Sequence, residues 1–315
     1  MVFAAPRRTA TTRLMPTTQP TAPADPSSWL PEPGTRVQHY KGGLYLVTGL
    51  CTVEATLERA VLYQALEPRS RQTVWMRPVS DFLALVRPGA PRFSPVHVPS
   101  RKALEAAVSG TGLGSGVLVA LGGLTQYRAP ERRFHGEEHL FDMFEKAQAW
   151  GLELSVEQVL AILLHDEVCV PGAPAGQNEA ASVARMRLLQ RVIAWPVNWD
   201  LIAQIIEDTV THAPTSPESV AVQALDLSSL AGTPQEFAVA NELIWQENRH
   251  LIQGDSPRRE FETRRLEFLE ALMRPGPVFK GAFAWLEPAL HRNVTALRER
   301  LVEAHLGPSP ATQVS

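Results

Sequence analysis

The sequence has only two cysteines and no long apolar run. Cys51 and Cys169 lie far apart, so we expect neither a disulfide framework nor a cysteine-based zinc site. The longest apolar candidate, Gly116 to Leu124, is broken by glycine and is far shorter than the roughly 18 residues of a membrane-spanning helix. The formal net charge of −3 lacks the basic excess of a broad nucleic-acid-binding surface. We therefore expect no disulfide scaffold, membrane span or broad nucleic-acid surface, and two separate thiols fit a reducing cytoplasm.

The first part of the chain differs in composition from the rest. The whole chain of 315 residues is 44% hydrophobic and 20% charged, which excludes a wholly disordered protein and suggests about two domains. Residues 1–34 are instead rich in proline, threonine and alanine without periodic apolar residues, so we predict a disordered tail. Arginines precede the first acidic residue, Asp25, as in a transit peptide, and a later start at Met15 is a further alternative.

Residues 35–87 have the pattern of a small β module. The segments 43–49, 60–66 and 73–77 are short, rich in β-branched and aromatic residues, and bounded by turn-forming or charged residues. Such short strands in a short stretch favour a small barrel or a curled sheet. Residues 88–100 contain four prolines, which stiffen the chain, and we predict that they form a linker between two domains.

Residues 101–306 have helical periodicity, and residues 307–315 are predicted to be a tail. Ser155 and Gln158 form a capping-box pattern before an apolar stretch that ends at Leu164, which predicts a central, buried helix. Thr233 and Glu236 predict another helix start, with proline at its first position. No strand pattern of comparable strength follows residue 100, so we expect this domain to be all-α.

Histidines and aspartates in the helical region have the types and spacing of metal ligands. His135 and His139 are four residues apart, which would place both imidazoles on one face of a helix. His165 and Asp166 end the predicted buried helix, where an unpaired carboxylate would be costly. Asp226 lies in another apolar stretch and is the best additional anionic ligand. This mixture of imidazole and carboxylate suits Mn²⁺, Fe, Zn²⁺ or Mg²⁺.

Six segments, taken together, resemble successive motifs of the HD superfamily. In chain order they are Arg133–His139, Leu163–Asp166, Pro171–Pro174, Asn178–Ser182, Thr209–His212 and Asp226–Gly232. The closest resemblance is to the bacterial branch of predicted metal-dependent HD phosphohydrolases, over about residues 101–304. It implies an all-α HD-domain helical bundle in which His139, His165, Asp166 and Asp226 hold a divalent metal, with Co²⁺ as a further possible ion. The chain departs from the family pattern at Gly136, where asparagine is usual, and at Gln177, where aspartate is usual.

The same resemblance suggests roles for other residues. The run that contains His135 is similar to one in cyclic-nucleotide phosphodiesterases, which implies that His135 is the general acid and His139 the metal ligand. Asp166 would bridge the ion and the attacking water. Glu179 and His212 would contact a second ion, the water or the phosphate, with structural roles as the alternative. Arg133 and Arg185 are candidate phosphate contacts through charge-assisted hydrogen bonds, with solvated surface positions as the alternative.

Two other interpretations compete with a phosphohydrolase. Residues 135–139 also match the H-x-x-E-H pattern of zinc peptidases with Glu138 as the base, but this leaves His165, Asp166 and Asp226 unexplained. The chain could instead be a binding or sensing protein whose metal site is structural or degenerate.

The predicted β module also resembles a known domain. The segments His39–Tyr45, Val61–Tyr63 and Val74–Phe82 are similar to a short bacterial domain of unknown function that is often found alone, over about residues 36–86. Its aromatic residues (Tyr40, Tyr45, Tyr63 and Trp75) would form either a face that binds a ligand or peptide, or a small core. We expect a cytoplasmic, metal-dependent phosphohydrolase whose partner is a small phosphorylated molecule, most simply a nucleotide, preceded by a β-barrel-like module.

Overall fold

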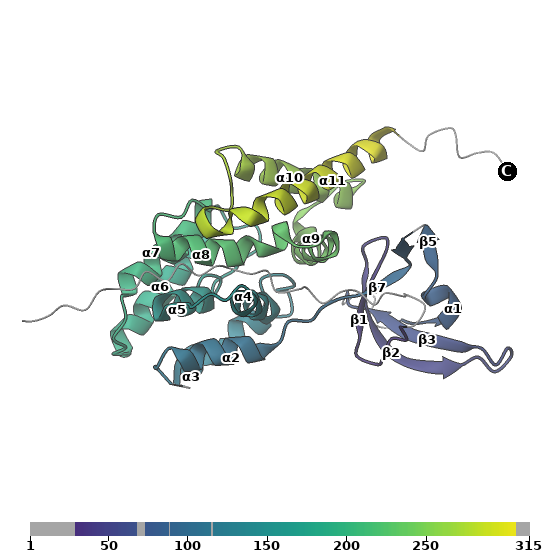
Figure 1. Ribbon diagram of the computed structural model, residues 1–315, viewed down its shortest axis with the longest axis horizontal. Coiled ribbons are helices and arrows are strands. Elements are labelled where there is room, and N and C mark those ends of the chain that lie inside the picture. The colour runs from purple at the N-terminus through teal and green to yellow at the C-terminus, as the bar shows by residue number, and fades with distance from the viewer. Residues whose placement is uncertain (1–28, 68–72, 88, 115, 307–315) are drawn as a thin grey trace, which may run out of the picture.

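The computed structural model describes residues 29–67, 73–87, 89–114 and 116–306. The tails predicted at residues 1–34 and 307–315 lie outside these residues, apart from residues 29–34. Among the described helices, none combines the length and the apolar character that crossing a membrane requires. Figure 1 shows the strands at one end of the molecule and the helices at the other, with α9 (Pro234–Asn248) as the helix nearest the sheet.

The N-terminal part is an open antiparallel sheet. Its strands are β1 (Arg36–His39), β2 (Leu44–Thr52), β3 (Arg59–Ala65), β4 (Val74–Pro78) and β7 (Phe93–Pro95), in the spatial order β4-β3-β2-β1-β7. The expectation of a barrel is wrong, because β4 and β7 are the two edges of this sheet and do not pair with each other. A one-turn helix, α1 (Val79–Phe82), inserts Phe82 into a small core with Val37, Val47, Val61, Tyr63 and Phe93.

The sheet continues into the stretch that was expected to be a linker. Strands β5 (Leu85–Arg87) and β6 (Ala90–Pro91) form a separate pair, and β7 pairs with β1. Proline is compatible with this arrangement because β7 is an edge strand, where a missing N–H interrupts no inner ladder. The compact unit therefore reaches Pro95, and we call residues 36–95 the β module. Only residues 96–100 separate it from the first helix of the second domain.

The remaining described residues form helices without strands. They are α2 (Arg101–Gly110), α3 (Gly116–Ala120), α4 (Glu137–Ala149), α5 (Val156–Leu164), α6 (Gln177–Val192), α7 (Trp199–Thr211), α8 (Pro217–Asp226), α9, α10 (Pro257–Met273) and α11 (Glu287–Leu306). Short 3-10 helices occupy Gly122–Arg128, Leu227–Ala231, Arg249–Leu251 and Gly281–Leu286. The helical domain expected from the sequence is thus confirmed as mostly helical.

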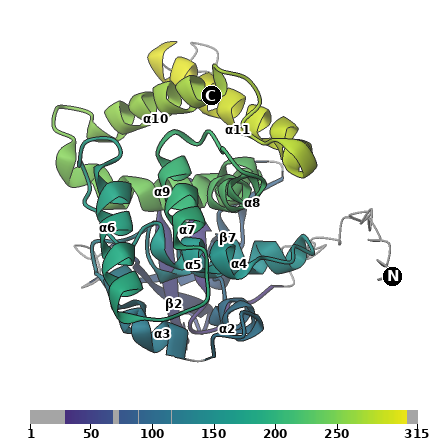
Figure 2. The ribbon, with the colours of Figure 1, turned by 90° about the vertical axis from the view of Figure 1, so that its left-hand side faces the viewer.

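Two apolar cores organise these helices. In Figure 2, α5 lies in the middle of the domain, and its residues from Gln158 to Leu164 are all buried. Its start is the predicted capping box, in which the Ser155 hydroxyl accepts the backbone N–H of Gln158 and the Gln158 side chain accepts that of Ser155. The second core joins α8 to α10 and α11, which form the outer layer at the top of Figure 2.

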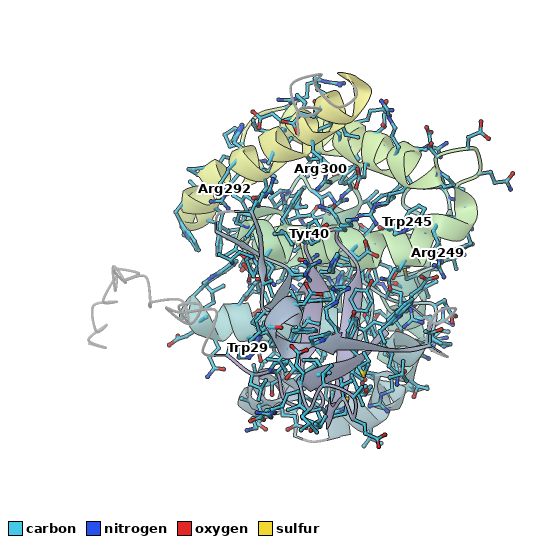
Figure 3. All side chains as sticks on the ribbon, turned by 90° about the vertical axis from the view of Figure 1, so that its right-hand side faces the viewer. Trp29, Tyr40, Trp245, Arg249, Arg292 and Arg300 are labelled. Atoms are coloured by element: carbon cyan, nitrogen blue, oxygen red, sulfur yellow. The ribbon has the colours of Figure 1, made fainter. Side chains whose placement is uncertain are left out.

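Polar contacts join the β module to the helices. The guanidinium of Arg36 on β1 makes two hydrogen bonds to the Glu138 carboxylate of α4, at 2.6 and 2.7 Å. The Gln235 side chain of α9 donates to the carbonyl oxygen of Pro95 at 2.8 Å. Arg249, which follows α9 and is labelled in Figure 3 with Trp245, pairs with Glu67. One side of α9 therefore contacts the β module.

Candidate metal centre

The segment before α4 separates the two histidines of the H-x3-H pattern. Helix α4 begins at Glu137 with Gly136 as its N-cap, so His139 lies in the first turn and His135 lies before the helix. The expectation that both imidazoles share one helix face is therefore wrong for His135. A Cβ at Gly136 would lie 3.1 and 3.2 Å from two backbone carbonyl oxygens. This close backbone approach explains why glycine occupies that position.

His165 and Asp166 follow the last residue of α5. The His165 ring is 2% exposed, and its Nδ1 is 2.8 Å from the carbonyl oxygen of Ile162. Its other nitrogen, Nε2, is 3.1 Å from a carboxylate oxygen of Asp166 and 3.7 Å from one of Asp226. The predicted His-Asp dipeptide therefore lies at the buried end of the central helix and faces a second carboxylate.

Asp226 joins α4 to this group. It is the last residue of α8, and its Oδ1 is 3.0 Å from Nε2 of His139, which is 87 residues away in the sequence. One ligand atom each from His139, His165 and Asp226 lie within 4.8 Å of one another. With Asp166 beside His165, all four residues that the resemblance implied as ligands come together from three helices.

The chemistry of these atoms fits a divalent cation. Because Nδ1 of His165 donates its proton to the Ile162 carbonyl, Nε2 of the neutral ring carries a lone pair. Within the part of the chain that the structure describes, this buried nitrogen has no hydrogen-bond partner, and it faces the carboxylates of Asp166 and Asp226. Lone pairs that converge in this way repel each other unless a proton or a metal cation lies between them. A ring that donates Nδ1–H to a carbonyl and ligates through Nε2 is a common arrangement in metal sites.

The charges of the group stabilise each other in the metal-free protein. Burial lowers the pKa of His165, but Asp166 and Asp226 outweigh it and hold the pKa well above its ordinary value. Burial raises the pKa of Asp226, but the neighbouring His139 and His165 outweigh burial and hold it well below its ordinary value. A divalent ion would replace the proton on the imidazole, so metal affinity should rise with pH.

His135 lies beside this group and bonds to residues that the sequence did not indicate. Its Nδ1 is 2.5 Å from Oε1 of Glu247 on α9, and its side chain also bonds to Cys169. Oε2 of Glu247 accepts three consecutive backbone N–H groups, from residues 133 to 135. The His135, Cys169 and Glu247 atoms are also close enough to hold an ion, but the Glu247 carboxylate is already fully bonded. No sequence pattern marks Glu247, which only the packing of α9 brings here.

Arg132 was likewise missed, although it is adjacent to a predicted residue. Its two terminal nitrogens donate to the carbonyl oxygens of Asp166 and Glu167, at 2.6 and 2.8 Å. The same guanidinium lies 5.2 Å from the ring centre of Tyr127. Arg132 therefore fixes the backbone that carries the His165–Asp166 pair.

Glu179 and His212 lie at the edge of the candidate centre. The carboxylates of Glu179 and Asp226 raise the pKa of His212. Burial has the larger effect and lowers it. His212 follows α7 with a φ of 50°, and its buried Nδ1 has no hydrogen-bond partner among the residues described. A left-handed conformation is uncommon for a residue other than glycine and often marks a functional position.

The two arginines predicted to contact phosphate have protein partners. Nε of Arg185 donates to a carboxylate oxygen of Glu167 at 2.8 Å. The backbone N–H of Arg133 bonds to Glu247. The solvated alternative fits Arg185, whose side chain is 48% exposed.

The zinc-peptidase interpretation finds little geometric support. Its base would be Glu138, but this carboxylate is bonded to Arg36 of the β module. Its two ligands would be His135 and His139, but Nδ1 of His135 is bonded to Glu247.

A pocket of about 350 Å³ lies between the β module and α9. Its aromatic lining consists of Tyr45, Tyr63, Trp75 and Phe93, and Glu242 and Gln246 of α9 complete it. Tyr63 also packs in the core of the β module. It therefore has both of the roles expected for these aromatic residues, in a binding face and in a small core. Tyr40 contacts His39 and is half-exposed.

Comparison with known proteins identifies only the N-terminal part. A family model described as "Protein of unknown function (DUF1653)" matches residues 35–95, which ends with β7. This match confirms the resemblance of the β module to a small domain of unknown function. No HD-domain model matches the helical part. No curated protein and no solved structure matches the chain.

Proposed function

We propose that the helical domain is a divalent-metal-dependent phosphohydrolase of the HD type that acts on a phosphate ester or anhydride. The proposal rests on the convergence of His139, His165 and Asp226, with Asp166 beside them. It is supported by the buried Nε2 of His165, which has no hydrogen-bond partner among the described residues and faces two carboxylates. The resemblance of the motifs to HD phosphohydrolases supplies the reaction class, and a nucleotide is the substrate that we favour.

Each residue of the group would have a distinct task. A divalent ion bound here would polarise a phosphoryl oxygen and lower the pKa of a water molecule. Asp166 would accept a hydrogen bond from the attacking water, because the neighbouring histidines keep this carboxylate charged. His135 would donate a proton to the leaving oxygen from Nε2, since its Nδ1 is bonded to Glu247. Glu179 and His212 would bind the water or the phosphate.

The proposal is tested by metal content and turnover measured on the same preparations. The metal-free full chain is reconstituted separately with Mn²⁺, Fe²⁺, Co²⁺, Zn²⁺ and Mg²⁺, and bound metal is measured by mass spectrometry. Hydrolysis is then followed with p-nitrophenyl phosphate and a panel of nucleoside mono-, di- and triphosphates. We expect bound metal and turnover in the wild type, and loss of both in His165→Ala and Asp166→Ala.

The exposed residue His250 offers a matched control, since it lies outside the candidate centre. His250→Ala should retain metal and activity. Metal binding without turnover of any phosphorylated compound would contradict the proposal. A wild-type chain that binds no divalent metal would contradict it as well.

A binding function is the second candidate, and the pocket between the β module and α9 favours it. Aromatic rings of the β module and the Glu242 carboxylate of α9 line this pocket, so both domains contribute to it. In this alternative the β module recognises a ligand or peptide, and the metal group has a structural role. Metal binding without turnover would support this alternative.

A further inference from the structure

Arg265 of α10 has an unsatisfied guanidinium. Its Nε donates to the side-chain oxygen of Asn241 on α9 at 3.0 Å, and its guanidinium carbon is 5.2 Å from the ring centre of Phe268. Within the described residues, its two terminal nitrogens have neither a hydrogen-bond acceptor nor a carboxylate partner. By contrast, Arg258 and Arg264 of the same helix each pair with glutamate.

The missing partner is notable because Arg265 is half-buried, so its guanidinium is partly withdrawn from water. Burial alone lowers the pKa of Arg265 to about 10, with no nearby acid to oppose the shift. A desolvated charge normally has a partner of opposite sign. Asn241 is itself fixed, because its side-chain nitrogen donates to the carbonyl oxygen of Phe237 at 2.9 Å. Arg265 is therefore held in place with two donors available to an anion.

Arg265 lies on the side of the candidate metal centre where His212 is found. The rings of His212 and Phe268 meet edge to face, with 6.4 Å between their centres. Burial lowers the pKa of His212. The charges of Asp226, Glu179 and Asp166 raise this pKa and that of Arg265 lowers it, so His212 lies within electrostatic reach of both the acids and the cation. Nδ1 of His212 is buried and also lacks a hydrogen-bond partner in the described ranges. Two groups with unmet hydrogen bonds thus lie on the same side of the candidate metal centre.

We propose that Arg265, together with Nδ1 of His212, binds the phosphoryl group of the substrate, and that the substrate is a phosphate monoester or a terminal phosphate. This inference rests on the proposed function and adds its substrate class. Arginine binds phosphate through two parallel N–H groups. A terminal phosphoryl group has three free oxygens, so one at the metal leaves two for the guanidinium. A diester has two free oxygens, and only one would remain.

The binding step is tested with inorganic phosphate as the probe. The full chain is loaded with the metal that it binds best, and phosphate affinity is measured by isothermal titration calorimetry. We expect Arg265→Gln to weaken phosphate binding at least tenfold. Arg265→Lys should weaken it less, because lysine keeps the positive charge but lacks the two parallel N–H groups of the guanidinium. Arg264→Gln is the matched control, since this neighbouring arginine is 62% exposed and paired with Glu260. It should bind phosphate within twofold of the wild type.

Folding and metal content are measured on each variant, so that a damaged structure is recognised. If Arg265→Gln fails to fold, Arg265→Lys decides the matter: a folded, metal-loaded Arg265→Lys with wild-type phosphate affinity would overturn the inference. The same result in a folded Arg265→Gln would overturn it too. Weaker binding in the folded, metal-loaded variant supports it.

Turnover distinguishes the substrate class and separates this inference from the proposed function. The wild type should hydrolyse p-nitrophenyl phosphate faster than bis(p-nitrophenyl) phosphate, and Arg265→Gln should lose this preference. A wild type that prefers the diester would overturn the inference alone, because hydrolysis at the metal would stand. Absence of metal or of all turnover in the wild type would instead overturn the proposed function.

Discussion

Nδ1 of His135 lies 2.5 Å from Oε1 of Glu247, although 112 residues separate them in the sequence. The other oxygen of Glu247 accepts the backbone N–H groups of Arg133, Phe134 and His135 at 3.0 to 3.1 Å. The Glu247 side chain is 2% exposed. One buried carboxylate of α9 therefore holds both the segment before α4 and the imidazole that we propose as the general acid.

We expect Glu247→Ala to lower the free energy of unfolding by about 3 kcal/mol, because it leaves three backbone donors and the His135 ring without their acceptor. Urea unfolding of the metal-free full chain measures this change. Glu260→Ala removes an exposed carboxylate that pairs with Arg264, and should cost less than about 1 kcal/mol. Equal effects of the two substitutions would contradict the role of Glu247.

The His135–Glu247 pair predicts how stability depends on pH. Burial lowers the pKa of His135, but Glu247 and Asp166 outweigh it and raise the pKa well above 6.5. A group whose pKa is higher in the folded state contributes stability that is complete below its unfolded pKa and is lost as pH rises through the folded value. We therefore expect the metal-free protein to lose stability as pH rises above about 6.5. The slope should become shallower in His135→Ala when the free energy of unfolding is measured across this range.

The Glu247 carboxylate of the same pair makes stability depend on pH in the opposite direction. Burial raises the pKa of Glu247, but His135 and the backbone N–H groups outweigh it and lower the pKa below 4.5. The stability from this carboxylate is present above its unfolded pKa and is lost as pH falls through the folded value. A free energy of unfolding that changes neither towards high pH nor towards low pH would contradict a charged His135–Glu247 pair.

Arg132 should support metal binding without touching the metal. We expect Arg132→Ala to weaken divalent-metal affinity by about 10- to 100-fold, because it frees the backbone carbonyls of Asp166 and Glu167 and so loosens the His165–Asp166 pair. Competition with a chelator of known affinity measures the change. Arg128→Ala is the control, since that side chain is about half exposed and pairs with Glu137. Unchanged metal affinity in Arg132→Ala would show that the carbonyl contacts are dispensable.

Gly136 should tolerate no larger residue. A Cβ there would press against the carbonyl oxygens of Arg132 and Tyr127, which are backbone atoms and cannot rotate away. We expect Gly136→Ala to destabilise the protein by about 1 to 3 kcal/mol. Gly110→Ala, at the end of α2 with open space around it, should be neutral or stabilising by up to about 1 kcal/mol. Thermal unfolding of both variants tests the difference, and an equally stable Gly136→Ala would refute the close approach.

Local signals in the sequence predicted the helix starts well. The capping boxes at Ser155 and Thr233 begin α5 and α9 at the expected residues, because a cap depends on side chains three positions apart and little else. The burial of α5 followed from its apolar residues. The same locality explains the error at His135, since spacing alone does not reveal that the helix begins only after Gly136.

Contacts between distant segments were harder to predict. Edge strand β7 lay in a proline-rich stretch, and its pairing with β1 depends on residues more than 50 positions away. Whether the sheet closes depends on its outermost strands, β4 and β7, and no pattern within a single strand reports this. The acidic residues Glu242 and Glu247 look alike in the sequence, yet one lines a pocket and the other holds His135.

The amino-acid sequence alone determined the division into a strand-rich part and a helical part, and the residue types that suit a divalent metal, because both follow from composition and short-range periodicity. Only the tertiary structure decided that His139, His165 and Asp226 meet, that Arg132 bonds to the backbone of Asp166, and that Glu247 bonds to His135. Burial removes the water that would otherwise satisfy each polar group, so the role of each of these side chains depends on which neighbour the packing supplies.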